Sequence, residues 1–276
     1  MNEIRFDGRV VLVTGAGRGL GAAYARAFAE RGASVVVHDA GVEKDGSGGD
    51  PSVAQAVADE IGGVASVVNL EEPGAGTRLV EEALERFGRL DAVIQNAGLV
   101  IWEELEVAAR SWDRMRKISV DAPFEITQAA LPGMKKQGYG RFVFTTSGRA
   151  MSKDRTRPGL AAYAVAKMAA AGLMFVTANE GEPHGILANA IAPAAATRVL
   201  TWKAEPGELE PEQVVPGVLF LASDECRVTG KVLEAAGGEF SVASWASSED
   251  VDFGREPVEP EVIAERWAEI EGVVRS

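Results

Sequence analysis

One glycine-rich segment constrains the fold more than any other feature of the sequence. Residues 14–21 read TGAGRGLG, between a β-branched run at residues 10–14 and an alanine-rich stretch that continues to about residue 31. Glycines allow a tight turn from strand to helix, and the free N–H groups at the helix N-terminus stabilise a pyrophosphate. Because the glycines have the strand and helix that such a motif requires, they predict a dinucleotide-binding βα turn rather than a purely structural one.

Strand-like and helix-like segments alternate along the rest of the chain. Further strands are predicted at residues 34–39, 64–69, 91–95, 141–146, 186–191 and 232–235. Such alternation is typical of a parallel sheet with crossover helices, and 276 residues with 46% apolar content suit one large α/β domain. We expect a Rossmann-like, doubly wound parallel sheet of about seven strands with helices on both faces.

Three segments carry separate expectations. Residues 111–136 predict one long helix with irregularities at Pro123 and Pro132. Residues 148–159 predict a loop, and residues 237–276 predict a C-terminal loop followed by an amphipathic helix from about Glu259. We expect this tail to pack on the body or on a neighbouring subunit, so that residues 1–276 form a single domain.

Charge and composition argue against several kinds of partner. The net charge of −13 repels nucleic acid, and the lone Cys226 can form neither an internal disulfide nor a zinc cage. The two histidines, His38 and His184, leave little material for a metal site or a Ser-His-Asp triad. No signal-peptide pattern is visible, and no apolar stretch reaches the roughly 18–20 residues of a membrane span. We expect a cytoplasmic protein without a metal.

The choice of coenzyme depends on two residues. Asp39 ends the second predicted strand, where a carboxylate can accept hydrogen bonds from the adenosine ribose and repels a 2′-phosphate. Arg18 is the opposing indication, because a guanidinium in the glycine turn could reach that phosphate. Since Asp39 occupies the discriminating position itself, the sequence favours NAD over NADP. A solvated aspartate at the strand end is the alternative.

A tyrosine and a lysine are the candidates for proton transfer. Tyr163 and Lys167, in the segment YAVAK, lie on one face of a predicted helix. A nearby ammonium and the positive nicotinamide ring of NAD⁺ would stabilise a phenolate, whose ordinary pKa is about 10. Ser147 follows the fifth strand, at the sheet edge where ligands bind, and could hold the substrate oxygen. The alternatives are a surface Tyr–Lys pair and a capping serine.

Four motifs occur together in the order known from one family. TGAGRGLG, the NAG turn at residues 96–98, Ser147 and YAVAK resemble the classical short-chain dehydrogenase/reductase family over nearly the whole chain. The resemblance implies that Ser147 orients the substrate oxygen, Tyr163 exchanges the proton, and Lys167 lowers the pKa of Tyr163 and binds the nicotinamide ribose. The coenzyme contacts expected from the turn and the resemblance are Gly15, Gly17, Arg18, Gly19, Leu20, Gly21, Asp39, Asn69, Leu70, Asn96, Ala97, Gly98, Tyr163, Lys167, Pro193 and Thr197.

The sequence departs from the family pattern at three points. Ser119 stands where the family often has an asparagine in a proton relay, so it is a further catalytic candidate, acting through a water. Asn69 replaces an aspartate that usually faces the adenine, and little loss is expected. Ser147 and Tyr163 are separated by a longer loop than is usual.

One branch of the family is the most similar. Residues 38–41 (HDAG) and 191–198 (IAPAAATR) resemble the (3R)-hydroxyacyl-CoA dehydrogenase part of peroxisomal multifunctional enzyme type 2 and its bacterial single-domain relatives. This implies a 3-hydroxyacyl thioester as substrate. One alternative is a non-catalytic dinucleotide sensor, which would be expected to lose Tyr163 or Lys167. Another is a cyclic, steroid-like or aromatic alcohol in a pocket of Leu99, Val100, Ile101, Trp102, Met151 and Trp202.

Two surfaces remain open to more than one interpretation. The loop at residues 148–159 carries Arg149, Lys153, Arg155 and Arg157 against a single acid, Asp154. It is either a solvated loop or a clamp for a carboxylate or for coenzyme A phosphates. The resemblance also implies a homodimer or homotetramer formed by the helices before and after the fifth strand. The small residues that would permit close contact, with core packing as the alternative, are Ala161, Ala162, Ala166, Ala169 and Ala170.

Overall fold

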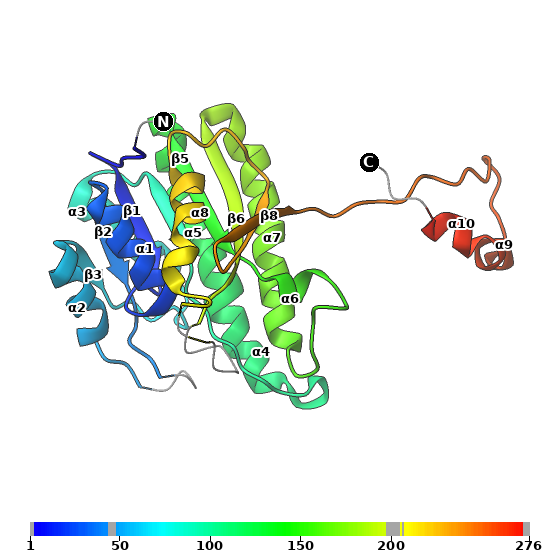
Figure 1. Ribbon diagram of the computed structural model, residues 1–276, viewed down its shortest axis with the longest axis horizontal. Coiled ribbons are helices and arrows are strands. Elements are labelled where there is room, and N and C mark those ends of the chain that lie inside the picture. The colour runs from blue at the N-terminus through cyan, green and yellow to red at the C-terminus, as the bar shows by residue number, and fades with distance from the viewer. Residues whose placement is uncertain (1–2, 44–47, 197–204, 206, 273–276) are drawn as a thin grey trace. The chain divides into compact units, whose positions relative to one another are not determined.

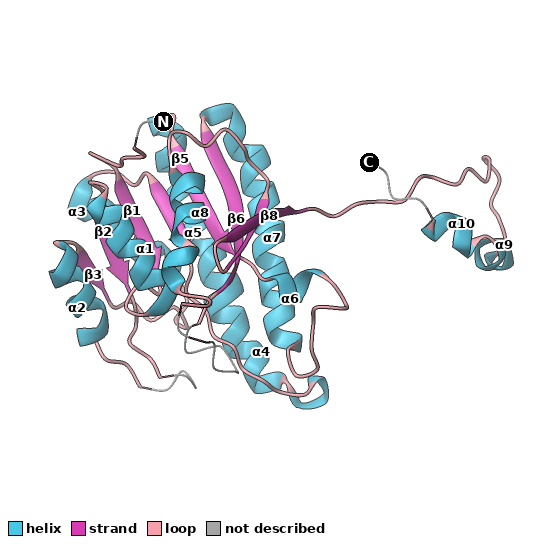
Figure 2. Ribbon diagram, in the orientation of Figure 1, coloured by secondary structure: helices cyan, strands magenta, loops and turns pink. Residues whose placement is uncertain are grey.

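The centre of the computed structural model is an eight-stranded sheet (Figures 1 and 2). The structure describes residues 3–43, 48–196, 205 and 207–272. The strand order is β3-β2-β1-β4-β5-β6-β7-β8, and each neighbouring pair from β3 to β7 is parallel. The order reverses between β1 and β4, which is the switch point of a doubly wound sheet. The strands are β1 (Val10–Thr14), β2 (Ser34–His38), β3 (Val64–Ser66), β4 (Ala92–Gln95), β5 (Gly140–Thr145), β6 (Ile186–Ala194), β7 (Val232–Ala236) and β8 (Glu239–Ala243).

Helices cover both faces of this sheet, as the sequence predicts. On one face α1 (Gly19–Glu30) packs against α2 (Ser52–Ile61) and α8 (Val215–Ala222). On the other, α5 (Ala122–Gln137) packs against α3 (Ala75–Phe87) and α7 (Ala161–Gly181). Every residue of β1, β4 and β5 is buried, which fits the nearly continuous apolar runs of β1 and β4, and β5 also buries the charged Arg141. The shorter helices are η1 (Leu105–Val107), α4 (Ala109–Arg116), η2 (Lys117–Asp121), α6 (Gly148–Met151), η3 (Glu182–His184) and η4 (Pro211–Gln213).

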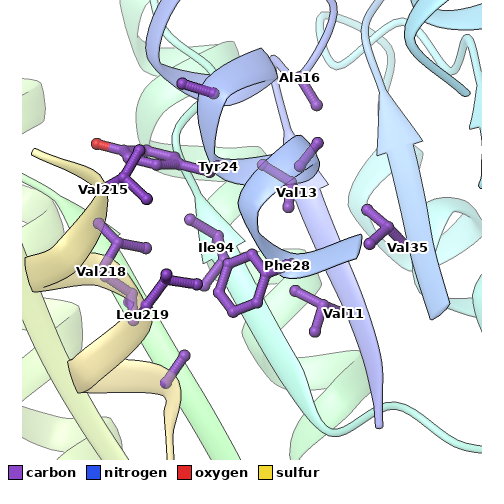
Figure 3. Close-up of a cluster of buried hydrophobic side chains, with 14 of the residues drawn as sticks. Val11, Val13, Ala16, Tyr24, Phe28, Val35, Ile94, Val215, Val218 and Leu219 are labelled. Atoms are coloured by element: carbon purple, nitrogen blue, oxygen red, sulfur yellow. The ribbon is translucent and has the colours of Figure 1, made fainter. Parts of the chain in front are cut away.

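One cluster of buried side chains fixes the glycine turn to the sheet (Figure 3). Val11 and Val13 of β1 and Ile94 of β4 form its floor, and Phe28 of α1 covers them. Tyr24 of α1 lies beside Val215 of α8. Because α1 begins at the glycine turn, this packing holds the N-terminus of α1 at the carboxyl end of β1.

The sheet has one strand more than expected. Gly237 and Gly238 have φ angles of +55° and +83°, which non-glycine residues rarely adopt, and they form a two-residue turn after β7. The chain returns as β8, inside the segment that we expected to be a loop. A glycine pair flanked by two strand-like runs is a hairpin signal, so this strand was detectable in the sequence.

Two other segments match the expectation only in outline. Residues 111–136 are helical throughout, as predicted, but the irregularity is a π-helical segment, η2, between α4 and α5. Pro123 is in the first turn of α5, where its missing N–H is harmless, whereas Pro132 is inside that helix. The expected loop at residues 148–159 begins with the short helix α6.

The last residues form a compact unit of their own. The described residues up to Val242 form one compact unit, and those from Ala243 onward form a second. In the second unit two short helices, α9 (Pro260–Glu265) and α10 (Trp267–Glu271), replace the single predicted helix. The Arg266 guanidinium lies 4.6 Å from the centre of the Phe253 ring and pairs with Glu269. That this tail belongs to one domain with the body stays a prediction.

The longest helix, α7, is strongly apolar. Among the described helices, the stretch Ala161–His184, which comprises α7 and η3, is long and apolar enough by length and composition to cross a membrane. We had expected no apolar stretch of that length. However, α7 packs on β5 and β6 and buries the side chains of Ala166 and Lys167, which is the arrangement of a core helix. We therefore interpret α7 as part of the core.

Candidate active site

A cavity of about 310 Å³ opens at the switch point of the sheet. Open parallel sheets bind their ligands at this edge, where the carboxyl ends of the strands meet. Of the predicted coenzyme contacts, Gly17 does not line the cavity, and Thr197 lies outside the described residues. Trp202, which was predicted for the alternative apolar pocket, also lies outside them. The contacts that do line the cavity are Gly15, Arg18, Gly19, Leu20, Gly21, Asp39, Asn69, Leu70, Asn96, Ala97, Gly98, Tyr163, Lys167 and Pro193.

The glycines of the turn are required by close packing. A Cβ on Gly15, whose φ is +65°, would lie 2.9 Å from the Cα of Ala97, and a Cβ on Gly21 would lie 2.0 Å from the Gly15 carbonyl oxygen. Gly17 supports the site from behind: its Cβ would lie 2.4 Å from Val53 Cγ1, and its N–H donates to Asp39 Oδ2 at 3.0 Å. The turn therefore brings backbone, rather than side chains, up to the cavity.

The two residues that bear on coenzyme choice are both anchored. The Asp39 carboxylate accepts hydrogen bonds from the Gly17 N–H at 3.0 Å and the Gly41 N–H at 2.8 Å, which hold it in the cavity wall. Arg18 Nη1 donates to the carbonyl oxygen of Val42 at 3.2 Å, and the side chain is exposed at the cavity mouth. The Asp39 carboxylate is therefore fixed at the end of β2, in the position expected from the sequence.

The NAG turn joins the end of β4 to the glycine turn. Asn96 Nδ2 donates to the carbonyl oxygens of Thr14 and Gly15 at 3.0 and 3.2 Å. The Thr14 hydroxyl accepts hydrogen bonds from the backbone N–H groups of Asn96 and Ala97, both at 3.0 Å. These four contacts close the floor of the cavity between β1 and β4.

Tyr163 and Lys167 lie one turn apart on α7 and both line the cavity. Burial lowers the pKa of Lys167 to about 8, and its ammonium donates to the Thr145 carbonyl oxygen at 3.0 Å. Burial also raises the pKa of Tyr163, while a hydrogen bond with Ser147 and the positive charge of Arg149 act in the opposite direction.

The arrangement refines two predictions about these residues. Burial raises the pKa of Tyr163, and the groups that act against this rise are Ser147 and Arg149, whereas Lys167 lies 5.8 Å from the centre of the tyrosine ring. Ser147 also combines two interpretations that we treated as alternatives. Its hydroxyl caps α6 by accepting the Arg149 N–H at 3.3 Å, and its hydrogen-bonding capacity also lowers the pKa of Tyr163 against the effect of burial.

Ser119 is buried in the π-helical segment next to this group. A Cβ on Gly98 would lie 3.7 Å from Ser119 Oγ and 3.5 Å from Lys167 Nζ, so Gly98 faces both groups at van der Waals distance. Within the described chain, Ser119 Oγ and Thr145 Oγ1 are buried without a hydrogen-bond partner. Two unpartnered hydroxyls beside a buried ammonium fit the hydroxyl-rich nicotinamide ribose of a dinucleotide.

Sequence reasoning missed several lining residues. His38, the last residue of β2, is buried, places Nε2 2.8 Å from the Val68 carbonyl oxygen, and has its pKa lowered by burial. Thr145 and Thr146 also line the cavity, from the end of β5, and Ile118 adds an apolar side chain to the cavity wall. The signal was available for the strand ends, because parallel strands terminate at the site.

Two of the three arginines of the predicted anion clamp, Arg155 and Arg157, have these protein partners. Arg155 Nη1 lies 2.5 Å from Glu234 Oε1 of β7. Arg157 Nη1 donates to the carbonyl oxygens of Asp154 and Thr156 at 3.0 and 2.8 Å. The Arg155 charge is therefore compensated within the folded chain.

Comparison with known proteins identifies the family. The family model described as short chain dehydrogenase matches residues 9–208. The chain belongs to the short-chain dehydrogenase family. Its members are oxidoreductases that use NAD or NADP, and the site described above contains the motifs of that chemistry.

Individual relatives of this short-chain dehydrogenase include larger proteins. Peroxisomal multifunctional enzyme type 2 of Mus musculus is 39% identical over 98% of this chain, which spans only 37% of that protein. A crystal structure of a short chain dehydrogenase from Mycobacterium avium has a TM-score of 0.84 and 37% identity, covering 98% of this chain and 97% of its own. The 3-ketoacyl-(acyl-carrier-protein) reductase from Brucella melitensis, complexed with NADH, has a TM-score of 0.74 and 28% identity, covering 84% and 98%.

Proposed function

We propose that this short-chain dehydrogenase uses NAD to interconvert the hydroxyl and keto forms of a 3-hydroxyacyl thioester. The observation that carries the proposal is the group formed by Ser147, Tyr163 and Lys167 at the carboxyl edge of the sheet. Tyr163 and Lys167 line the cavity, and Ser147 lies close enough to Tyr163 to act on its pKa, so it can hold an alcohol oxygen near the point where the phenol exchanges its proton.

The chain's own residues divide this work. Ser147 orients the substrate oxygen, and Tyr163 removes the hydroxyl proton in oxidation or supplies it in reduction. Lys167 is held by the Thr145 carbonyl, from where its ammonium can bind the ribose of the coenzyme. Bound coenzyme would supply the hydride acceptor for oxidation of the carbinol carbon as NAD⁺, and the hydride donor for reduction of the ketone as NADH. The N–H groups at the start of α1 and the Asp39 carboxylate would hold the pyrophosphate and the adenosine ribose.

NAD, rather than NADP, is proposed because Asp39 is fixed by two backbone hydrogen bonds. A carboxylate held in this way cannot move away from a 2′-phosphate. If a neutral residue replaced Asp39, the exposed Arg18 would be the residue that binds the 2′-phosphate of NADP. Asp39→Ser should therefore reduce the preference for NAD by at least about tenfold in kcat/KM, equivalent to 1.4 kcal/mol. An unchanged ratio of NAD to NADP activity would contradict this assignment.

The thioester substrate is supported by relatives and not by the cavity itself. The branch resemblance, which the 39% identity to the mouse enzyme supports, and the name of the Brucella 3-ketoacyl-(acyl-carrier-protein) reductase favour an acyl thioester. The apolar walls formed by Leu99, Val100 and Ile118 favour the second candidate, a cyclic or aromatic alcohol. Both candidates use the same catalytic group, so substrate screening separates them.

The deciding experiment follows NADH absorbance with 3-hydroxyacyl-CoA thioesters and with apolar secondary alcohols, using Tyr163→Phe as the control. Thioester turnover that falls by a factor of about 10²–10⁴ in the variant is expected. Turnover of cyclic or aromatic alcohols alone would replace the substrate and keep the mechanism. An equally active Tyr163→Phe enzyme would refute the catalytic assignment.

We also propose a homo-oligomer that pairs through α5 and α7. Phe124 of α5 and Val165 and Val176 of α7 expose more than half of their surface. The predicted small-residue face is not this surface, because Ala162, Ala166 and Ala170 are buried in the core. The other two members of that set, Ala161 and Ala169, are half-buried. Light scattering should show a dimer or tetramer that Val176→Glu dissociates, whereas a monomeric wild-type protein would refute the proposal.

A further inference from the structure

The ion pair between Arg155 and Glu234 lies directly on the backbone next to Ser147. A Cβ on Gly148 would lie 2.2 Å from Arg155 Nη2, 2.5 Å from Arg155 Cζ and 3.0 Å from Glu234 Oε1. The guanidinium and the carboxylate therefore occupy the space that a side chain at position 148 would need. Gly148 is the first residue of α6, and Ser147 is its N-cap.

The pair connects two segments that are distant in sequence. Arg155 belongs to the basic loop at residues 148–159. Glu234 lies on β7 and pairs with Ala192 of β6, which directly precedes Pro193 of the cavity wall. Glu234 has 23% of its side chain exposed and Arg155 has 52%. The loop is also fixed at its far end, where the Glu103 N–H donates to the Gly159 carbonyl oxygen at 2.9 Å.

We propose that Arg155 and Glu234 are positioning residues that clamp Gly148 and thereby aim the Ser147 hydroxyl at Tyr163. The inference rests on the proposed catalytic role of Ser147 and assigns Arg155 a task other than binding a substrate anion. Neither residue of the pair lines the cavity, and the residue that connects them to it is Ser147, which adjoins Gly148 and acts on the pKa of Tyr163 in the cavity wall. The pair also explains why the longer loop after Ser147 does not displace the serine from Tyr163.

Kinetics of a double-mutant cycle test the clamp. Arg155→Met and Glu234→Gln should each lower kcat by about tenfold to a hundredfold, because small displacements of a catalytic group have effects of this size. The double variant should be no worse than either single variant, since the two changes remove one shared contact. The KM for NAD should stay within about twofold of wild type, and Lys153→Met, which removes a charge from the same loop, is the matched control.

The pH profile separates positioning from a merely structural role. The hydrogen bond from Ser147 lowers the pKa of Tyr163, so its loss should move the midpoint of kcat/KM for alcohol oxidation to higher pH. Arg155→Met and Glu234→Gln should both show this shift, and Lys153→Met should not. Variants that match wild type in kcat and in midpoint would overturn the clamp.

Substrate binding by Arg155 would give a different pattern. With 3-hydroxybutyryl-CoA, Arg155→Met would then raise KM alone, the effect would be absent with neutral 1-phenylethanol, and Glu234→Gln would be silent. Hydrogen exchange on the nucleotide-free protein is independent of any substrate. Faster exchange at residues 148–157 in both pair variants supports the clamp. Unchanged exchange overturns it, whereas an active Tyr163→Phe enzyme would refute the proposed function instead.

Discussion

The two edges of the sheet treat their buried polar groups in opposite ways. At the amino edge, Asp91 precedes β4, and its carboxylate accepts the Val10 N–H at 2.9 Å and forms ion pairs with Arg9 and Arg89 at 3.2 and 2.6 Å. At the carboxyl edge, β2, β4 and β5 end in His38, Gln95 and Thr145. Each of these has a buried side-chain atom that lacks a partner among the described residues.

This difference indicates what each edge contributes. A buried polar atom without a hydrogen bond costs about 1–3 kcal/mol, so folding alone does not favour several of them at one edge. The carboxyl edge also buries the Lys167 ammonium, which lowers its pKa to about 8. The amino edge therefore stabilises the fold, and the carboxyl edge holds polar groups in readiness for a ligand at some expense of stability.

The largest expected effect is at the amino edge. Asp91→Ala should lower the free energy of unfolding by about 3–5 kcal/mol, because it leaves two guanidinium groups without the buried carboxylate that they share. Urea denaturation measures the loss, and the KM for NAD should be unchanged under native conditions. Asp224→Ala is the control: this partner of Arg9 is 60% exposed, so about 1 kcal/mol or less should be lost. Equal losses in the two variants would contradict the contrast between the edges.

The carboxyl edge should respond in the opposite direction. The pKa of Lys167 falls from 10.5 to about 8 on folding, so below pH 8 the buried charge lowers stability by about 3 kcal/mol. Lys167→Met removes that penalty and loses the hydrogen bond to Thr145, so we expect a net gain of about 2 kcal/mol at pH 7 together with loss of activity. Between pH 8 and 10.5 the unfolded chain binds more protons, so the wild type gains stability and the difference shrinks. A less stable variant at pH 7 would refute the assignment.

The order of elements and most of the cavity could be predicted from sequence because their signals are local. Short motifs each indicate a strand end or a helix face within a few residues: the glycine turn, Asp39, the NAG turn and YAVAK. Parallel strands bring these ends together. Interactions between distant segments gave no such signal. Arg155 and Glu234 are 79 residues apart, and nothing near either one predicts the other.

The burial of individual residues and the irregularity of the helix also could not be predicted from the sequence. Ser119 was predicted from its place in a pattern, but its burial follows from the π-helical segment, which the sequence of η2 does not announce. Likewise, Ser147 could be a cap or a catalytic hydroxyl on sequence grounds, and only the position of α6 shows that it is both hydrogen-bonded to Tyr163 and a cap.

The smallest expected effect comes from comparing two tyrosines. Tyr24 lies between α1 and α8, beside Val215 (Figure 3), and its hydroxyl is buried with no partner within the described part of the chain. Burial raises its pKa, so the phenol stays neutral and the hydroxyl contributes only an unmet hydrogen bond. Tyr24→Phe should therefore stabilise the fold by about 1 kcal/mol without affecting activity.

Tyr139 at the amino edge is the matched control for this change. The guanidinium groups of Arg9 and Arg141 lie 3.7 and 4.3 Å from the centre of its ring, and its hydroxyl hydrogen-bonds Asp224. Tyr139→Phe removes a satisfied hydroxyl, so it should destabilise the protein by about 1 kcal/mol. Thermal or urea unfolding of the two variants should give shifts of opposite sign. If Tyr24→Phe also destabilises, its hydroxyl has a partner in solution, and the carboxyl edge would be the main remaining location of unmet polar groups.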